Sequence, residues 1–174
     1  FRFLNRVWRL AAVVMDGIKD VQPFVGNPDE LEDTLRELYR KTHQTIQRVT
    51  KDIEDRFHFN TAISAVMELF NTMSVLDMQK DHGEQLAVMR FAMESLILLL
   101  SPIVPHFAEE LWQELGHRSS IFLAPWPRYR KDALKEDELM IVVQVNGKLR
   151  SRFQVAANTD QETIKERALT DERI

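Results

Sequence analysis

Apolar positions recur at helical spacing along most of the first 116 residues. From residue 2 to about residue 17, apolar side chains fall on one side of a helical wheel and arginines on the other. From Leu31 to Ile53, apolar residues and Thr42 follow one another at steps of three or four, which is typical of a long bundle helix. Three further helical stretches begin near residues 60, 84 and 105. The pattern therefore predicts a bundle of about five helices.

Helix caps sharpen two of these boundaries. Asn27 followed by Pro28 is typical of an N-cap with proline at the first helical position, so we expect the second helix to begin there. Gly116 follows the last apolar stretch and is expected to end the fifth helix.

The pattern changes after residue 125, where a charged stretch without a helical apolar face extends to residue 138. A β-branched run over 139–145, the turn pair Asn146 and Gly147, and a second run over 148–155 predict a β-hairpin. Thr159 and Glu162 form a capping box for a final helix. The predicted fold is mainly α, with a helical bundle over 1–125, a charged linker over 126–138 and an incomplete α+β module over 139–174.

Basic side chains follow one another along the second strand of this hairpin. With a two-residue turn, Lys148, Arg150 and Arg152 would lie in a row on one face. Their expected partners across the hairpin are Val145, Val143 and Ile141, and the residues expected on the opposite, helix-covered face are Met140, Val142, Leu149, Phe153 and Val155. The row could bind a phosphate backbone, or it could protect an edge hairpin from aggregation, and the pattern favours neither.

Two other clusters of cations lie on the predicted bundle. Arg2, Arg6 and Arg9 form a stripe on the polar face of the first helix. The second helix adds Arg40, Lys41, Arg48, Lys51 and Arg56. Spacing alone favours a solvated helix face over an RNA-binding surface for these clusters.

Composition excludes several classes of protein. The net charge of −4 excludes a generally basic nucleic-acid coat, so any RNA-binding surface must be local. The count of zero cysteines excludes disulfides and thiolate metal sites and fits a cytoplasmic location. The longest apolar run, 96–100, is far below the ~20 residues that span a bilayer, so no membrane partner is expected. The first residue is Phe1 rather than methionine, and we expect the sequence to be a piece of a longer chain.

Catalytic signatures are missing from the sequence. It has no glycine-rich phosphate loop and no Gly-x-Ser-x-Gly or His-Glu-x-x-His motif. His106, Glu109 and Glu110 come closest to a metal cluster, but they lack the second, matching motif of a di-metal bundle. We therefore expect no catalytic residue, no cofactor-binding residue and no metal ligand in this chain.

Several segments resemble a known family, the class I aminoacyl-tRNA synthetases for large aliphatic amino acids. The matching segments are 2–10, 59–69, 101–106 and 126–127. The segment 142–150 resembles the start of the small C-terminal domain of the bacterial leucyl enzymes in particular. A valyl or isoleucyl enzyme remains an alternative, as does a helical scaffold module from another class of protein.

The resemblance implies a role in holding tRNA. A parent enzyme of this family, a leucine–tRNA ligase, would use ATP and Mg²⁺ in a catalytic domain outside this sequence to join leucine to tRNA(Leu), and this piece would not be catalytic alone. We expect a monomer, and the residues expected to bind tRNA are Arg2, Arg6, Arg9, Arg48, Lys51, Arg56, Lys148, Arg150 and Arg152. The resemblance itself implies the three arginines of the first helix and the three cations of the hairpin. It also implies that Phe3, Leu4, Trp8, Ala62, Ile63, Val66, Trp112 and Trp126 belong to the core.

Overall fold

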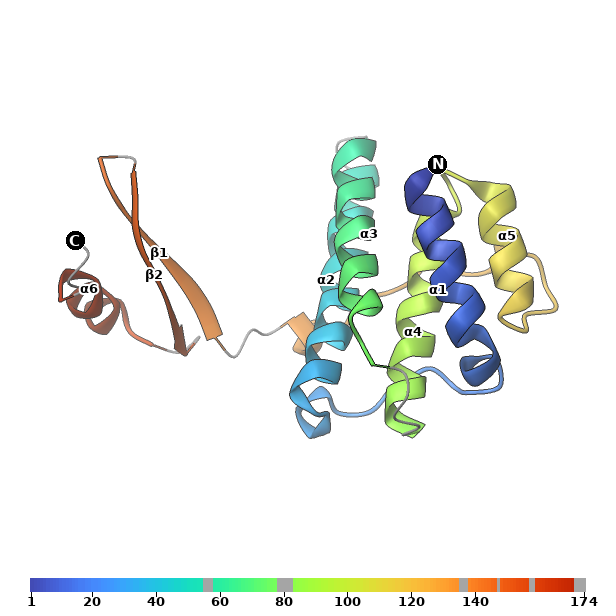
Figure 1. Ribbon diagram of the computed structural model, residues 1–174, viewed down its shortest axis with the longest axis horizontal. Helices are drawn as coiled ribbons and strands as arrows, with labels where there is room; N and C mark the ends of the chain where they lie inside the picture. The colour runs from blue at the N-terminus through green and yellow to red at the C-terminus, as the bar shows by residue number, and fades with distance from the viewer. Residues whose placement is uncertain (55–57, 78–82, 135–137, 147, 157–158, 171–174) are drawn as a thin grey trace. The chain divides into compact units, whose positions relative to one another are not determined.

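The computed structural model describes residues 1–54, 58–77, 83–134, 138–146, 148–156 and 159–170. The chain divides into two compact units, Phe1–Leu134 and Lys135–Ile174, which are described separately below. The first is a helical bundle and the second is a hairpin with one helix (Figure 1). This confirms the predicted fold class.

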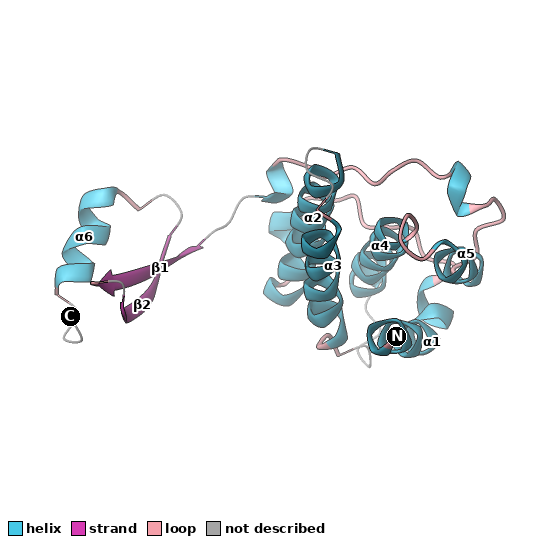
Figure 2. Cartoon of the chain, turned by 90° about the horizontal axis from the view of Figure 1, so that it is seen from above, coloured by secondary structure: helices cyan, strands magenta, loops and turns pink. Residues whose placement is uncertain are grey.

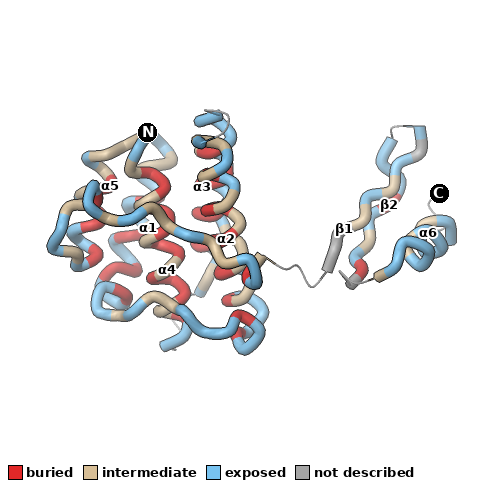
Figure 3. The backbone as a smooth tube through the Cα atoms, turned by 180° about the vertical axis from the view of Figure 1, so that it is seen from behind, coloured by how far each residue is buried: buried red, intermediate tan, exposed pale blue. Residues whose placement is uncertain are grey.

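Among its described residues, the first unit has five α-helices, as the apolar pattern predicted. They are α1 (Arg2–Ile18), α2 (Asp33–Glu54), α3 (Phe59–Ser74), α4 (Gly83–Leu100) and α5 (Pro105–Glu114). Successive helices run in opposite directions (Figure 1). Figure 2 shows α2 and α3 as one pair, with α4 between that pair and α5. In α1, α2, α3 and α5, buried positions alternate with exposed ones along the helix (Figure 3).

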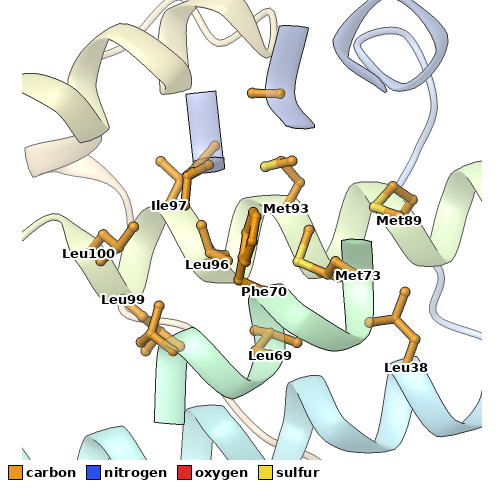
Figure 4. Packing of buried hydrophobic residues seen from close by; sticks show 14 of the residues in the cluster. Leu38, Leu69, Phe70, Met73, Met89, Met93, Leu96, Ile97, Leu99 and Leu100 are labelled. Carbon is orange, nitrogen blue, oxygen red and sulfur yellow. The ribbon is translucent and has the colours of Figure 1, made fainter. Parts of the chain in front are cut away.

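The fourth helix is the centre of the bundle because it contacts α1, α2, α3 and α5. Its side chains are buried on almost every side, which explains why its sequence has so little amphipathic character. Phe70 and Met73 of α3 point toward Met93 and Leu96 of α4, and none of the four is more than 3% exposed (Figure 4). Burying side chains of this size stabilises the fold by roughly 1.5 to 3 kcal/mol each.

The predicted start of the second helix is wrong by several residues. Asn27 does act as an N-cap, since its side chain accepts a hydrogen bond from the Asp29 amide, but it caps the short 3-10 helix Pro28–Glu30. Leu31 then adopts an extended conformation and is 1% exposed. The extended backbone of Leu31 interrupts the helix, and α2 begins only at Asp33.

The segment 120–134, here called the strap, leads away from α5 and packs on the bundle. It contains the 3-10 helices Ile121–Leu123 and Asp132–Leu134, and Ala133 is buried. The predicted linker over 126–138 thus includes residues that contact the bundle up to residue 134, and residues 135–137 lie outside the described part. The charged composition did not indicate this packing because single side chains, described below, make the contacts.

In the second unit, β1 (Glu138–Val145) pairs antiparallel with β2 (Lys148–Ala156), and α6 (Gln161–Leu169) follows. Asn146 has a φ of 51°, as a tight turn requires, and Gly147 lies outside the described residues. The N-cap of α6 is Asp160, whose carboxylate accepts from the Thr163 amide, rather than the predicted Thr159.

A β-bulge between Val143 and Gln144 changes the predicted register. Lys148 lies opposite Val145 as expected, but Ser151 takes the place opposite Val143, and Arg152 lies opposite Val142 instead of Ile141. The extra residue in β2 shifts the alternation of side chains by one position. The predicted row of three cations on one face is therefore wrong.

The faces of the hairpin differ from the prediction for the same reason. Val155 and Ser151 are buried and Phe153 is partly buried, whereas Val142 and Leu149 are about half exposed. The Arg167 side chain of α6 donates to the Gln154 carbonyl at 3.1 Å and lies 5.1 Å from the Phe153 ring centroid. Of the residues predicted to face the helix, Phe153 and Val155 are correctly placed, and the Met140 side chain lies outside the described part.

Candidate nucleic-acid interface

The arginine stripe predicted on the first helix is present and exposed. Arg2, Arg6 and Arg9 lie on α1, on the side away from the buried residues Val7 and Ala11. The seven-residue step from Arg2 to Arg9 rises about 10 Å, a length over which one strand of a nucleic-acid duplex presents about three phosphates. The three guanidinium groups can therefore follow a nucleic-acid backbone.

Arg6 differs from its two neighbours because other side chains already hold it. Its Nη2 donates to Asn71 Oδ1 of α3 at 3.0 Å, and its guanidinium lies 4.8 Å from the Phe70 ring centroid. Phe3 packs edge-on against the same ring at 5.6 Å. No ion pair or side-chain hydrogen bond to Arg2 or Arg9 occurs among the described residues. The stripe thus combines one residue that joins α1 to α3 with two that extend into solvent.

On α2, the candidates Arg48 and Lys51 are both exposed. Arg48 Nη1 lies 3.6 Å from Glu68 Oε1, and Lys41 Nζ donates to Glu68 Oε2 at 2.7 Å. The hydrogen bond from Lys41 is the main cause that lowers the pKa of Glu68, so this carboxylate stays charged at neutral pH. Arg40 is partly buried, and Arg56 lies outside the described residues.

The three cations of the hairpin are exposed but do not form one row. Lys148 lies opposite Val145, Arg150 is the extra residue of the bulge, and Arg152 lies opposite Val142 on the other face. A phosphate backbone on one face of the hairpin cannot contact all three in the way that regular alternation predicted.

A charged cluster in the core was not predicted from the sequence. Arg90 interrupts the apolar run of α4 and is 6% exposed, with hydrogen bonds to Glu94 and to the ends of two helices. His117 stacks on Trp112 with ring centroids 3.5 Å apart. The sequence signal for this cluster was the pair Arg90 and Glu94, four residues apart within a mainly apolar stretch of α4.

Trp126, which was expected in the core, and Arg130 make hydrogen bonds from the strap to the bundle that the sequence did not predict. Trp126 Nε1 donates to Thr50 Oγ1 of α2 at 2.9 Å. The Arg130 amide donates to His43 Nδ1 at 3.2 Å, and the Arg130 guanidinium donates to the Val25 and Gly26 carbonyls. Burial, reinforced by the nearby Arg130 charge, lowers the pKa of His43 to about 4, so the His43 ring is neutral.

The carboxylate considered earlier as a metal ligand has a structural role. Glu109 accepts hydrogen bonds from Ser120 Oγ, from the Ile121 amide and from Gln113, and the last of these is the main cause that lowers its pKa. Within the described ranges, no three histidine or acidic side chains gather as metal ligands would. None of the helices in those ranges has the length and hydrophobicity to cross a membrane.

An open cavity of about 740 Å³ lies between α4, the end of α5 and the strap. Phe91, Leu98 and Trp126 form apolar parts of its wall, and Glu94 and His117 line its polar part. It contains none of the cations predicted to bind tRNA.

The comparisons with known proteins agree with this architecture. The family model described as the anticodon-binding domain of tRNA ligase matches residues 36–166. The chain is 55% identical over 174 residues to a leucine–tRNA ligase of Desulfatibacillum aliphaticivorans and 48% identical over 179 residues to one of Geobacter sp. strain M21. These alignments cover all of this chain and 20% and 21% of the two relatives, so the chain spans about a fifth of their length.

A solved structure is similar as well. It is the crystal structure of a ternary complex of the Agrobacterium radiobacter K84 agnB2 LeuRS with tRNA and LeuAMS, with a TM-score of 0.79 and 32% sequence identity. The match covers 97% of this chain and 21% of that one. The family match extends over three quarters of the chain and includes most of the bundle, the strap and the hairpin, and on this ground the chain belongs to the family of anticodon-binding domains of tRNA ligases.

Proposed function

We propose that this chain is the tRNA-binding and positioning region of a leucine–tRNA ligase. The observation that carries the proposal is the similarity over the full chain to enzymes of that name, at 48% to 55% identity. The whole enzyme would join leucine to tRNA(Leu) with ATP and Mg²⁺ in the cytoplasm, and the reaction would take place outside this region.

Charge and rigidity support a positioning role. Contacts to phosphate and sugar fix the orientation of a nucleic acid and carry little sequence information. A bundle that presents Arg2 and Arg9 from one rigid helix can orient a tRNA in this way. Because the chain as a whole has a net charge of −4, binding would be limited to such local basic surfaces.

Charging specificity of the protein encoded by the complete open reading frame tests the proposal. We expect leucine to be attached to tRNA(Leu), whereas attachment of valine or isoleucine to its own tRNA would contradict the proposal. Light scattering adds a second test, since we expect a monomer whose mass increases when tRNA is added. A dimer whose mass does not change when tRNA is added would favour a scaffold module.

The α1 stripe is tested by replacing Arg2, Arg6 and Arg9 together by alanine. We expect the apparent KM for tRNA to rise and the salt dependence of binding to decrease by about one unit of slope for each phosphate that is no longer bound. Formation of leucyl-adenylate should not change, because this step does not require tRNA binding by α1. An unaltered KM and salt slope would show that the stripe does not bind tRNA.

A further inference from the structure

Arg90 connects the ends of two helices that are far apart in the sequence. Its Nη1 donates to the carbonyls of Ile18 at 3.1 Å, Lys19 at 2.7 Å and Leu115 at 2.9 Å. Ile18 is the last residue of α1, and Leu115 follows α5 directly. Carbonyls at helix C-termini lack partners within their own helix and carry the negative end of the helix dipole. One buried cation therefore satisfies both helix ends.

The charge of Arg90 is balanced within the bundle. Its Nε and Nη2 donate to Glu94 Oε1 at 3.2 Å and 2.9 Å. His117 Nε2 lies 2.6 Å from the same oxygen and 3.1 Å from Arg90 Nη2. A guanidinium can only donate, and the short distance to a carboxylate requires a proton on Nε2, so His117 donates to Glu94. Arg90 and His117 thus both donate to Glu94 Oε1.

The two ends of α1 are attached by different side chains. Near the N-terminal end, Arg6 contacts Phe70 and Asn71 of α3. At the C-terminal end, Arg90 joins α1 to α5, and Gly116 approaches so closely that a Cβ there would lie 3.4 Å from the Lys19 carbonyl oxygen. The arginine stripe lies along the same helix. Its direction is therefore fixed partly by a residue more than 70 positions away.

We infer that Arg90 is a positioning residue for tRNA. It fixes α1 against α5 and thereby sets the direction in which α1 presents Arg2 and Arg9. This inference rests on the proposed function of the chain. Because Arg90 itself is only 6% exposed, its effect on tRNA is indirect. Its effect is transmitted through the carbonyls at the end of α1.

The experiment uses the full-length ligase with the double substitution Arg90→Met and Glu94→Leu, which removes both charges without leaving either buried alone. We expect the apparent KM for tRNA(Leu) to rise on the order of tenfold, below the roughly 100-fold loss that a 1 Å misplacement can cause. The kcat and leucyl-adenylate formation should not change. Arg90→Lys, which keeps a cation near the carbonyls, should recover part of the loss. Val49→Ala creates a cavity at α2 and is the control for any effect of lowered stability on KM.

A spectroscopic readout follows α1 directly. Trp8 of α1 packs on Phe107 of α5 with ring centroids 6.0 Å apart, whereas Trp126 is bound to α2. In the double variant, we expect the indole N–H resonance of Trp8 to shift and that of Trp126 to stay in place. An unchanged Trp8 resonance, or a KM no higher than in Val49→Ala, would overturn the inference.

The outcomes for the two proposals can be told apart. If the triple substitution of Arg2, Arg6 and Arg9 raises KM and the Arg90 double substitution does not, the inference about Arg90 fails and the proposed function stands. If neither raises KM, the tRNA role of α1 fails, and the inference that rests on it fails as well.

Discussion

Trp126 Nε1 donates a hydrogen bond to Thr50 Oγ1 at 2.9 Å, which joins the strap to α2 across 76 positions of sequence. The Thr50 hydroxyl uses its own hydrogen to donate to the Ile46 carbonyl at 2.7 Å. The hydroxyl therefore accepts and donates at once, and the indole depends on it for a partner.

Loss of this bond should destabilise the chain moderately. We expect Trp126→Phe to lower the free energy of unfolding by about 1 kcal/mol, because an aromatic ring remains but the hydrogen bond is removed. Urea unfolding followed by circular dichroism measures the effect. Thr50→Val and the variant with both substitutions complete a double-mutant cycle. Strictly additive effects of the two substitutions would show that the bond contributes nothing.

His43 should make stability depend on pH. Its folded pKa of about 4 lies below the ordinary 6.5, so the unfolded chain takes up the proton first as the pH falls. The free energy of unfolding should therefore decrease between pH 6.5 and about pH 4, by on the order of 3 kcal/mol at most, with no contribution above that window. Urea midpoints over this range measure the decrease.

The control for this prediction is His43→Asn, whose side-chain oxygen can still accept from the Arg130 amide. Carboxylates titrate in both proteins, so the difference between the two pH profiles isolates the histidine. Parallel profiles would contradict the assignment to His43.

Substitutions of Arg6 and Arg9 should affect stability differently, because Arg6 contacts α3 and Arg9 extends into solvent. Arg6→Ala removes a cation–π interaction and a hydrogen bond, and we expect it to lower the free energy of unfolding by about 1 kcal/mol. Arg9→Ala should change stability by less than about 0.5 kcal/mol. Thermal or urea unfolding of the two variants measures this contrast. Equal losses of stability would show that Arg6 is not held by α3.

Glu68 should weaken tRNA binding in the wild-type protein, because it lies beside Arg48 and Lys41. We expect Glu68→Gln to lower the apparent KM for tRNA about twofold, at a cost in stability below about 1 kcal/mol, since exposed ion pairs contribute little. Glu37→Gln, at an exposed position of α2, is the matched control for the change in net charge. An unchanged KM would argue that Arg48 does not contact tRNA.

Sequence patterns predicted the helices well, because apolar spacing reports burial directly. The five helices and the hairpin lie near their predicted places, and Val66 and Ala62 are buried as expected. Trp8 was placed in the core and is 43% exposed, since an aromatic residue at the edge of an apolar face can pack with only part of its ring.

The errors concern features that periodicity does not encode. One extra residue in β2 moved Arg152 to the other face of the hairpin, and no composition signal marks a bulge of this kind. Several partners of Arg90 and Arg130 are backbone carbonyls, which every residue carries and which leave no mark in the sequence. Contacts from side chain to distant backbone became visible only in three dimensions.

The central position of α4 also determines how the bundle opens. Because α4 contacts α1, α2, α3 and α5, none of its buried amides can reach water unless several helices separate together. Hydrogen exchange in α4 therefore measures the opening of the entire bundle. Exchange in the hairpin, which belongs to the other compact unit, measures only the local opening of that unit.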